Sequence, residues 1–283
     1  MSENNVPYLS AVEAAKKWGL SERSVRNYCA LGRVEGAFLV GKTWNIPAGA
    51  EKPDRKRRND ASMALIDVLQ AEMEAKRAGG IYNSVLVDLS YASMHMDGSE
   101  LSHEDVQDLF ATGETGSKDI RLSDLAGMLH HFRCVDTVIE HARYPLSENF
   151  VYQLYWILTG SLPAYLAGPD DKLPRHKVVA ELSAPLYRYS NQTATGLAPL
   201  LALHYDLMRK QPFGARTGQV ARLVLFKECL KKGLVPVIIA DSRKLQYQRA
   251  LSMWPADQSY LTQLCEAAQK SFRGALDYFG IES

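Results

Sequence analysis

Hydrophobic residues in this 283-residue chain recur mainly every three or four positions, the spacing of amphipathic helices, and alternate near the N-terminus and in one short segment of the body. Glycines and prolines interrupt this pattern and mark turns between the helices. Helices are predicted from residue 61 to a break at 79–80, over 81–96, from a start within 101–106, and over 123–142, 147–159, 197–208, 220–231 and 259–278. The body of the chain is therefore predicted to be all-helical.

The first 50 residues follow a different pattern. A capping box of Ser10 with Glu13 opens a short helix, and Gly19 ends it. A second helix is predicted over residues 22–31 after a short turn, which is the arrangement of a helix-turn-helix. Residues 32–47 then alternate as a β-hairpin does.

Residues 8–47 resemble the winged helix-turn-helix of the bacterial MerR and excisionase families, which open Leu-Ser-x-x-Glu-Ala-Ala and end Trp-x-Ile-Pro. This chain has Leu-Ser-Ala-Val-Glu-Ala-Ala over 9–15 and Trp-Asn-Ile-Pro over 44–47. The resemblance implies that the second helix enters the major groove of double-stranded DNA and that the hairpin wing contacts the DNA backbone or the minor groove. The residues that it assigns to DNA contact are Arg23, Arg26, Asn27 and Lys42.

Charge is distributed unevenly along the chain. Residues 1–60 carry 11 lysines and arginines against 7 acidic residues, while the net charge of the whole chain is only +1. A basic end suits a DNA partner, although a small solvated domain that binds protein is the alternative. We predict a head over residues 1–50, a basic linker over 51–60 and a helical domain over 61–283. The basic run at 55–58 is either an arm that contacts phosphates or a solvated linker.

The cysteine spacing and the hydropathy of the chain argue against a zinc-binding, disulfide-stabilised, secreted or membrane-spanning protein. The four cysteines form no Cys-x-x-Cys pair, which argues against a zinc site or a disulfide framework. The first residues lack the pattern of a signal peptide. The uncharged stretch 149–169 contains polar residues and prolines, which favours a core helix followed by a turn over a membrane span. We expect a cytoplasmic protein without a membrane partner.

One turn between two helices carries the candidate chemistry. Residues 211–222 read Gln-Pro-Phe-Gly-Ala-Arg-Thr-Gly-Gln-Val-Ala-Arg, in which the proline and glycines mark a turn that opens a buried helix. Backbone amides at such a helix start form an anion site.

This stretch resembles the signature of the Fic (Fido) family, His-Pro-Phe-x-Asp/Glu-Gly-Asn-Gly-Arg-x-x-Arg. The matching residues are Pro212, Phe213, Gly218 and Arg222. Segments on both sides also resemble family segments, in the same order and spacing from about residue 83 to the C-terminus. Active members of the family transfer AMP from ATP to a protein hydroxyl, with the signature His as base and its acid as the Mg²⁺ ligand.

The departures from the signature decide the predicted chemistry. Gln211 stands in place of the catalytic His, and a neutral amide cannot accept the hydroxyl proton, so this position is predicted to be inactive. Ala215 stands in place of the acid and offers no oxygen to a metal ion, so no metal site and no Mg²⁺ are expected. No cofactor is required, while ATP or another nucleotide is compatible with a degenerate anion site. That site comprises Arg216, Thr217, Gly218, Gln219 and Arg222.

An earlier segment resembles the inhibitory helix motif of the family, Ser/Thr-x-x-x-Glu-Gly. Its members in this chain are Ser93, Asp97 and Gly98. The resemblance implies that Asp97 pairs with Arg222 and blocks the productive placement of ATP. A chance Asp-Gly turn is the alternative, because this dipeptide is common in turns.

Two more segments suggest binding roles. His130 and His131 are neighbours on a predicted helix, so their side chains point apart, and we interpret them as a solvated pair rather than a metal site. Residues 161–184 correspond to the flap of the Fic family, and 173–181 alternates as a short strand. The edge of such a strand would bind a peptide or protein partner by β-augmentation.

The predicted fold class is mainly α: a winged helix-turn-helix with a small hairpin wing, followed by an all-helical Fic fold with a short β-hairpin flap. The first functional hypothesis is a DNA-binding regulator whose body has lost transferase chemistry and serves as a sensing, interaction or homodimerising module. The second is a divergent Fic enzyme that transfers AMP or another phosphate-containing group to a protein and is regulated by the motif at 93–97. The third is an adaptor whose flap binds a peptide. Gln211 and Ala215 favour the first over the second.

Overall fold

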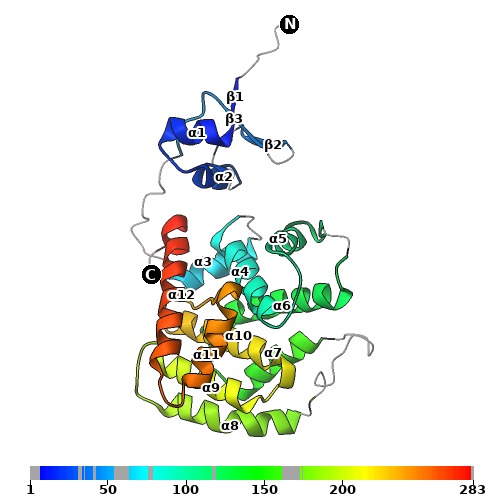
Figure 1. The fold of residues 1–283 in the computed structure, drawn as a ribbon, viewed down its shortest axis with the longest axis vertical. Helices are drawn as coiled ribbons and strands as arrows, with labels where there is room; N and C mark the ends of the chain where they lie inside the picture. Colours follow the sequence, from blue (N-terminus) through cyan, green and yellow to red (C-terminus); the bar gives the residue numbers. More distant parts are fainter. Residues whose placement is uncertain are drawn as a thin grey trace. The chain divides into compact units, whose positions relative to one another are not determined.

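The computed structural model describes residues 7–30, 34, 36–40, 43–53, 64–75, 79–116, 119–160, 173 and 175–281. The chain divides into two compact units (Figure 1). The first consists of Met1–Ser62 with Ala78–Gly80, and the second of Met63–Arg77 with Ile81–Ser283. Each unit contains a hydrophobic core of its own.

The small unit, called the head below, consists of two helices and a three-stranded antiparallel sheet. Its elements are β1 (Tyr8–Leu9), α1 (Ala11–Trp18), α2 (Glu22–Ala30), β2 (Phe38–Val40) and β3 (Thr43–Pro47). Strand β3 lies between β1 and β2, with Tyr8 opposite Pro47 and Leu39 opposite Trp44. The predicted pair of helices and the two hairpin strands are therefore present, while the hairpin turn at 41–42 lies outside the described residues.

The first helix of the head begins and ends where the sequence predicts. The Ser10 N–H donates to Glu13 Oε2 at 2.8 Å, and the Glu13 N–H donates to the Ser10 hydroxyl at 3.3 Å, which completes the capping box. Gly19 ends α1 with a φ of 65°, which a residue without a Cβ adopts readily. Val25 of α2 and Ile46 of β3 are fully buried, so the helices and the sheet share one core.

The large unit, called the body below, is helical. Its elements are α3 (Leu65–Glu74), α4 (Ile81–Met96), α5 (His103–Thr112), α6 (Leu122–Glu140), α7 (Glu148–Thr159), α8 (Arg175–Asn191), α9 (Ala198–Lys210), the short 3₁₀ helix η1 (Gly214–Arg216), α10 (Thr217–Lys231), the short 3₁₀ helix η2 (Asp241–Arg243), α11 (Lys244–Met253) and α12 (Ser259–Phe279). With the small sheet of the head, this confirms the predicted mainly α fold class.

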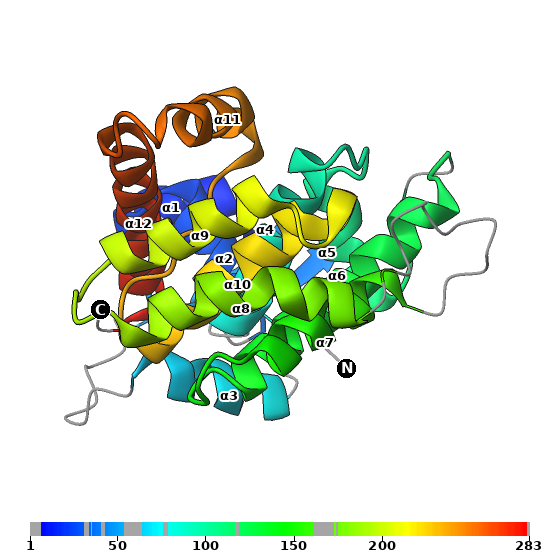
Figure 2. The same cartoon turned by 90° about the horizontal axis from the view of Figure 1, so that it is seen from below.

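Helix α10 is the central element of the body. It runs through the middle of the unit (Figure 2) and packs against α9, α6, α4 and α7. Every residue from Thr217 to Leu230 is buried, including the adjacent Lys227 and Glu228. The Lys227 ammonium lies 3.0 Å from the Glu228 carboxylate and donates to the Tyr144 carbonyl at 2.8 Å. Burial of these charges is therefore offset by pairing.

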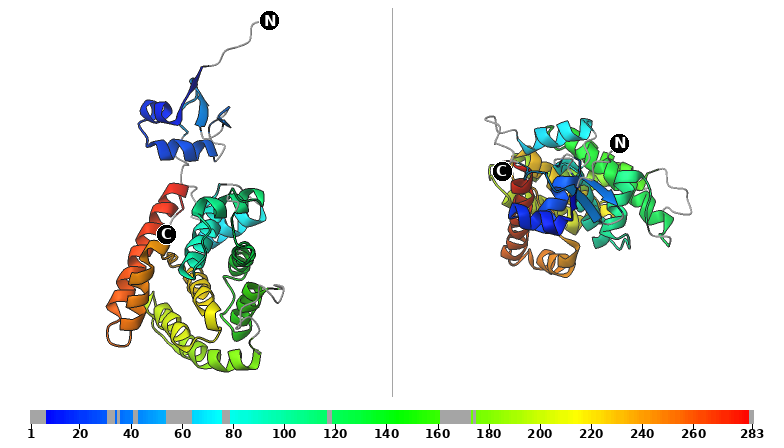
Figure 3. Two further views of the ribbon diagram at one scale, coloured as in Figure 1. Left: turned by 45° about the vertical axis from the view of Figure 1, so that its right-hand side comes forward. Right: turned by 90° about the horizontal axis from the view of Figure 1, so that it is seen from above.

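The C-terminal helices cover another side of α10. Helix α12 lies along one side of the body (Figure 3) and packs against α11, α9 and α4. A second hydrophobic cluster joins these helices to α10 through buried residues such as Leu201, Leu225 and Leu261. The C-terminal helix thus closes the body, as its apolar spacing predicts.

The predicted strand at 173–181 is wrong, because residues 175–181 belong to α8. Val178, Leu182 and Leu186 are buried at helical spacing, so burial of this stripe overrides the short alternation. Pro185 lies inside the same helix. Residues 161–172 of the predicted flap lie outside the described part of the chain.

The interpretation of His130 and His131 as a solvated pair is also wrong. His131 is completely buried on the inner face of α6, and its Nδ1 lies 2.9 Å from the Ser90 hydroxyl. Burial, with a smaller effect of the nearby Arg222 charge, lowers the pKa of His131 to about 3, so the ring is neutral. The two side chains point apart as predicted, but one of them points into the core.

The first part of the uncharged stretch, residues 149–159, lies in α7, a core helix as predicted, while residues 161–169 lie outside the described part of the chain. Phe150, Val151 and Leu154 are buried on its inner face. None of the helices in the described ranges is long and apolar enough to span a bilayer.

Candidate anion site at the start of α10

The connection from α9 to α10 begins at Gln211. This residue ends α9 in the left-handed conformation, with φ 52° and ψ 46°, and is the one described non-glycine residue with positive φ. Its side-chain Nε2 donates to the Met208 carbonyl at 2.6 Å. The amide at this position therefore bonds back to its own helix and acts as a hydrogen-bond donor.

The turn after Gln211 is fixed by two buried side chains. Phe213 is completely buried and stacks on Tyr155, with ring centroids 5.0 Å apart. The Phe213 N–H donates to the hydroxyl of the equally buried Thr217 at 3.1 Å. Ala215 is exposed on the short helix η1, and Arg216 occupies the N-cap position of α10. These contacts thus fix the backbone conformation of the turn that leads into α10.

Arg222 connects the start of α10 to the end of α4. Its Nε donates to the Ser93 hydroxyl at 2.9 Å, and its Nη2 donates to the Ser93 carbonyl at 2.8 Å. The same Nη2 lies 2.7 Å from Asp97 Oδ2, so the predicted ion pair is present. The Arg222 side chain is 8% exposed and the Asp97 side chain 26% exposed. The pair lies in a partly buried setting, where it is stronger than a surface pair.

Gly218 allows this ion pair to lie over the first turn of α10. A Cβ built on Gly218 would be 2.8 Å from Arg222 Nη1 and 3.2 Å from Asp97 Oδ1. One carboxylate oxygen of Asp97 therefore bonds to Arg222 while the other lies beside the helix start. The carboxylate of Asp97 therefore lies beside the N-terminal end of α10, where the helix dipole favours negative charge.

Two buried hydrogen bonds of His204 lie close to Arg222. His204 Nδ1 lies 3.1 Å from the Ala221 carbonyl, and its Nε2 lies 2.6 Å from the Tyr247 hydroxyl. The pattern assigns the ring proton to Nδ1, because the carbonyl can only accept. The charge of the nearby Arg222 acts to lower the pKa of Tyr247, against the larger effect of burial. Burial lowers the pKa of His204 to about 4 and raises the pKa of Tyr247 to about 12, so both groups are neutral beside the arginine.

Gln219 is the member of the site whose bonding is incomplete. It is 2% exposed, and its Oε1 has no hydrogen-bond partner among the described residues. A buried amide oxygen in this state is destabilising. In the resemblance to the Fic signature this position corresponds to the first arginine, and the side chain here is neutral.

The donor set of the site does not fit Mg²⁺. The methyl side chain of Ala215 supplies no oxygen, and the carboxylate of Asp97 is already bonded to Arg222. Across the described part of the chain, no group of three or more His, Cys, Asp or Glu side chains is arranged to hold a metal ion. The charged groups of the arrangement are the guanidinium of Arg222 and its partner, the carboxylate of Asp97.

The residues predicted to contact DNA are described only in part. Arg23 and Arg26 are exposed on α2. Arg26 donates to Glu22 Oε1 from both Nε and Nη2, at 2.9 and 2.6 Å. The side chain of Asn27 and the whole of Lys42 lie outside the described residues.

The sequence interpretation located the members of the body site but missed some of their supports. The expected pair of Asp97 with Arg222 is present, Ser93 accepts from Arg222, and Asp97 lies beside Gly218, whereas the Gly98 carbonyl accepts from Arg121. The placement of His204 and Tyr247 close to Arg222 had one sequence signal: both residues fall in flanking segments that resemble the Fic family. No signal in the sequence indicated the contacts of Arg121 and Asp124 with the loop after Asp97.

Solved structures with a similar fold come from Fic proteins. A Fic domain containing signaling protein from Bacteroides thetaiotaomicron has a TM-score of 0.59 and 18% identity, over 77% of this chain and 99% of that chain. A Fic-1 fragment from C. elegans with an E274G substitution has a TM-score of 0.57 and 16% identity, over 75% of this chain and 71% of that one. A Fic family protein from Desulfovibrio desulfuricans has a TM-score of 0.54 and 14% identity, over 81% and 79%.

At the level of sequence, no family model and no curated protein matches the chain. Identities of 14–18% with matching topology show a shared fold and leave the chemistry to be argued from the site itself.

Proposed function

We propose that this protein, whose body has the Fic fold, is a DNA-binding regulator in which the body senses a nucleotide or another phosphate-containing anion and does not transfer AMP. One observation carries the proposal: Gln211, at the position of the catalytic base, is a neutral amide whose nitrogen donates to the Met208 carbonyl. The head supplies the DNA-binding surface, and the start of α10 supplies the anion site.

The proposed loss of AMP transfer follows from the need for a base that accepts the proton of the target hydroxyl. When a protein hydroxyl attacks the α-phosphorus of ATP and pyrophosphate leaves, the hydroxyl proton must go to a base. The amide nitrogen of Gln211 has no basic lone pair, and its oxygen is too weakly basic near neutral pH. General base catalysis is typically worth about 100-fold or more, and the missing metal ligand at Ala215 removes a further share.

The proposed sensing of a phosphate-containing anion follows from the position of Asp97, a negatively charged side chain of the protein itself. Asp97 lies beside the start of α10, where a phosphate group would bind, and pairs with the same Arg222 that would receive it. An incoming anion must displace the carboxylate, so binding is coupled to release of the end of α4 from α10. The bound and free states then differ in the position of the segment that follows Asp97.

The head supports the DNA half of the proposal through its exposed basic helix. Arg23 and Arg26 are exposed on α2, the second of the two helices. Arg26 is held by Glu22 one turn earlier on the same exposed face. A surface pair of this kind contributes little stability, so a DNA phosphate or base can replace Glu22 as the partner of Arg26 at small cost.

A divergent Fic enzyme is the second candidate, and the arrangement of Ser93, Asp97 and Arg222 favours it. An inhibitory contact has a clear use where there is an activity to inhibit. The regulator is preferred because the contact is equally useful as a sensor, whereas the amide at position 211 has no comparable catalytic use. The peptide-binding adaptor loses its support, since residues 175–181 form a helix rather than a strand edge.

Calorimetric titration of the intact protein with ATP tests the sensing role. We expect weak binding by the wild type and tighter binding by Asp97→Ala, because the variant removes the competing carboxylate. Asp97→Asn, which keeps the size of the side chain but not its charge, should lie between the two. Equal ATP affinities in the three proteins would contradict the proposal.

A further inference from the structure

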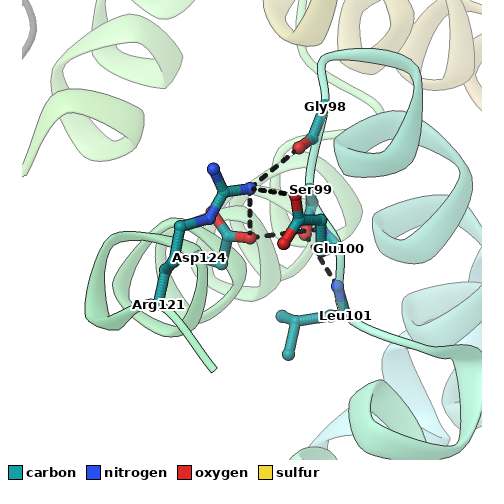
Figure 4. Close-up of polar contacts among 6 residues, drawn as sticks. All are labelled: Gly98, Ser99, Glu100, Leu101, Arg121 and Asp124. Atoms are coloured by element: carbon teal, nitrogen blue, oxygen red, sulfur yellow. Dashed lines mark hydrogen bonds and ion pairs between the residues drawn. The ribbon is translucent and has the colours of Figure 1, made fainter. Parts of the chain in front are cut away.

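The loop that follows Asp97 is held by the first turn of a third helix, α6. Arg121 Nη2 donates to the Gly98 carbonyl at 3.1 Å, and the Glu100 N–H donates to Asp124 Oδ2 at 3.1 Å. The same Arg121 nitrogen lies 3.1 Å from Asp124 Oδ2, which joins the two contacts into one network (Figure 4). Two consecutive parts of the loop backbone are therefore tied to α6.

These contacts fall directly after the residue that closes the anion site. The N–H groups of Asp97 and Ser99 both donate to the Met94 carbonyl, at 3.0 and 3.1 Å, which ends α4. Gly98 has a φ of 98°, a conformation that residues with a Cβ rarely adopt, and Leu101 is buried at 1% exposure. Arg121 holds the carbonyl of Gly98, the residue that follows Asp97. The backbone after Asp97 is thus held by a contact that does not involve Arg222.

We propose that Arg121 and Asp124 form a latch that positions Asp97 against Arg222, so that the first turn of α6 sets how readily the anion site opens. This inference rests on the proposed sensing function of that site. Arg121 and Asp124 are positioning residues, because neither contacts Arg222 or the start of α10. Their contacts raise the population of the closed state in which Asp97 occupies the anion site.

The charged side chains of Arg121 and the neighbouring Glu100 are exposed to solvent. The side chain of Arg121 is 53% exposed and that of Glu100, 3.6 Å from Arg121, is 80% exposed. Arg222, by contrast, is 8% exposed. Exposed charge contacts are weak and screened by salt, whereas partly buried ones persist. Asp124 is 14% exposed, so Arg121 is the member of the latch that solvent and salt reach.

A purely structural role for the network is the competing explanation. Asp124 lies in the first turn of α6, where an acidic residue stabilises a helix on its own. However, its carboxylate accepts from Glu100 of the loop. A helix-stabilising role predicts that its removal lowers stability without changing ATP affinity, and without dependence on Asp97.

The test combines ATP affinity with amide hydrogen exchange on the full chain. Arg121→Ala and Asp124→Ala should each raise ATP affinity by roughly threefold and speed exchange in residues 98–101, because the closed state loses part of its support. In an Asp97→Ala background, Arg121→Ala should change ATP affinity no further, since the latch acts through Asp97. Arg133→Ala removes an exposed charge from the same helix and is the matched control, with neither effect expected.

Three results would overturn the latch: unchanged exchange in residues 98–101, unchanged ATP affinity in Arg121→Ala while Asp97→Ala gains, or equal gains from Arg121→Ala in both backgrounds. If no variant binds ATP, including Asp97→Ala, the proposed sensing function has failed. The latch is then judged by urea unfolding, in which Arg121→Ala and Asp97→Ala should act non-additively. Additive effects would show that Arg121 does not position Asp97.

Discussion

Asp97 Oδ2 lies 2.7 Å from Arg222 Nη2 and joins the end of α4 to the first turns of the buried helix α10. The two residues are far apart in sequence, and the loop after Asp97 is held in turn by α6. The contact therefore links three helices around the start of α10. It is a stabilising feature, and in the proposed sensing function it is the contact that an anion displaces.

Removal of the acid should destabilise the protein. Asp97→Ala leaves the guanidinium of Arg222 without its charged partner, and we expect the free energy of unfolding to fall by about 1–3 kcal/mol. The loss stays below that of a fully buried pair, because Asp97 is 26% exposed and water can partly replace the carboxylate. Urea denaturation measures it. Glu266→Ala, at an exposed position in the interior of α12, is the control and should change stability by less than about 0.5 kcal/mol.

A methyl group at Gly218 should disturb the same pair by steric means. The Cβ of Gly218→Ala would lie 2.8 Å from Arg222 Nη1, so the guanidinium must shift, and we expect a loss of about 1–3 kcal/mol. Gly274→Ala is the matched control in α12, where nothing lies within 4 Å of the added Cβ. That substitution should be neutral or stabilise by up to about 1 kcal/mol. Equal effects of the two substitutions in thermal unfolding would contradict the close approach at Gly218.

Stability should rise with pH between about 4 and 6.5. Burial lowers the pKa of His204 to about 4 and of His131 to about 3, both from an ordinary value of 6.5. The unfolded chain therefore binds more protons in this window, and the stabilisation present above pH 6.5 is lost as the pH falls. Each ring accounts for on the order of 3 kcal/mol.

The matching measurement is urea unfolding of wild type and His204→Gln at pH 4 to 7. The variant should be less stable at pH 7 but should lose less stability on acidification. An equal pH slope in both proteins would show that His204 is not the neutral buried ring described above. The His103 pKa is raised by its hydrogen bond to Asp88, so its contribution has the opposite sign and is lost above pH 6.5.

Binding to duplex DNA should depend on α2 and on salt. Arg23→Ala or Arg26→Ala should weaken binding of a labelled duplex, and affinity should fall steeply as salt rises because phosphate contacts release counterions. Fluorescence anisotropy at several salt concentrations gives both quantities. Arg273→Ala, an exposed arginine of α12, controls for loss of charge. Unchanged DNA affinity after removal of residues 1–60 would exclude the head as the DNA-binding surface.

Local signals in the sequence predicted much of the fold. Helix α4 spans Ile81–Met96 as predicted, because Gly79 and Gly80 break the pattern before it and an Asp-Gly turn follows it. The capping boxes at Ser10 and Ser102 also depend only on residues three positions apart.

The failures of the sequence interpretation involve burial and long-range contacts. Whether 173–181 forms a strand or a helix is decided by the core that receives Val178, which a window of nine residues does not contain. His131 was assigned to solvent because helix spacing alone does not show how wide the buried face of α6 is. The bond from Arg121 to the Gly98 carbonyl joins residues in separate helices and loops and leaves no mark in the local pattern.

The central claim is that the body has the Fic fold without AMP transfer, and transfer of radiolabel from α-labelled ATP tests it most directly. The assay compares the intact protein, Asp97→Ala and Gln211→Ala, each with Mg²⁺ and a cell lysate that supplies protein hydroxyls. We predict no labelling by any of the three, including the variant in which the anion site is opened, because position 211 supplies no base. Labelling by the wild type or by Asp97→Ala that is absent with Gln211→Ala would contradict the account and assign catalysis to Gln211.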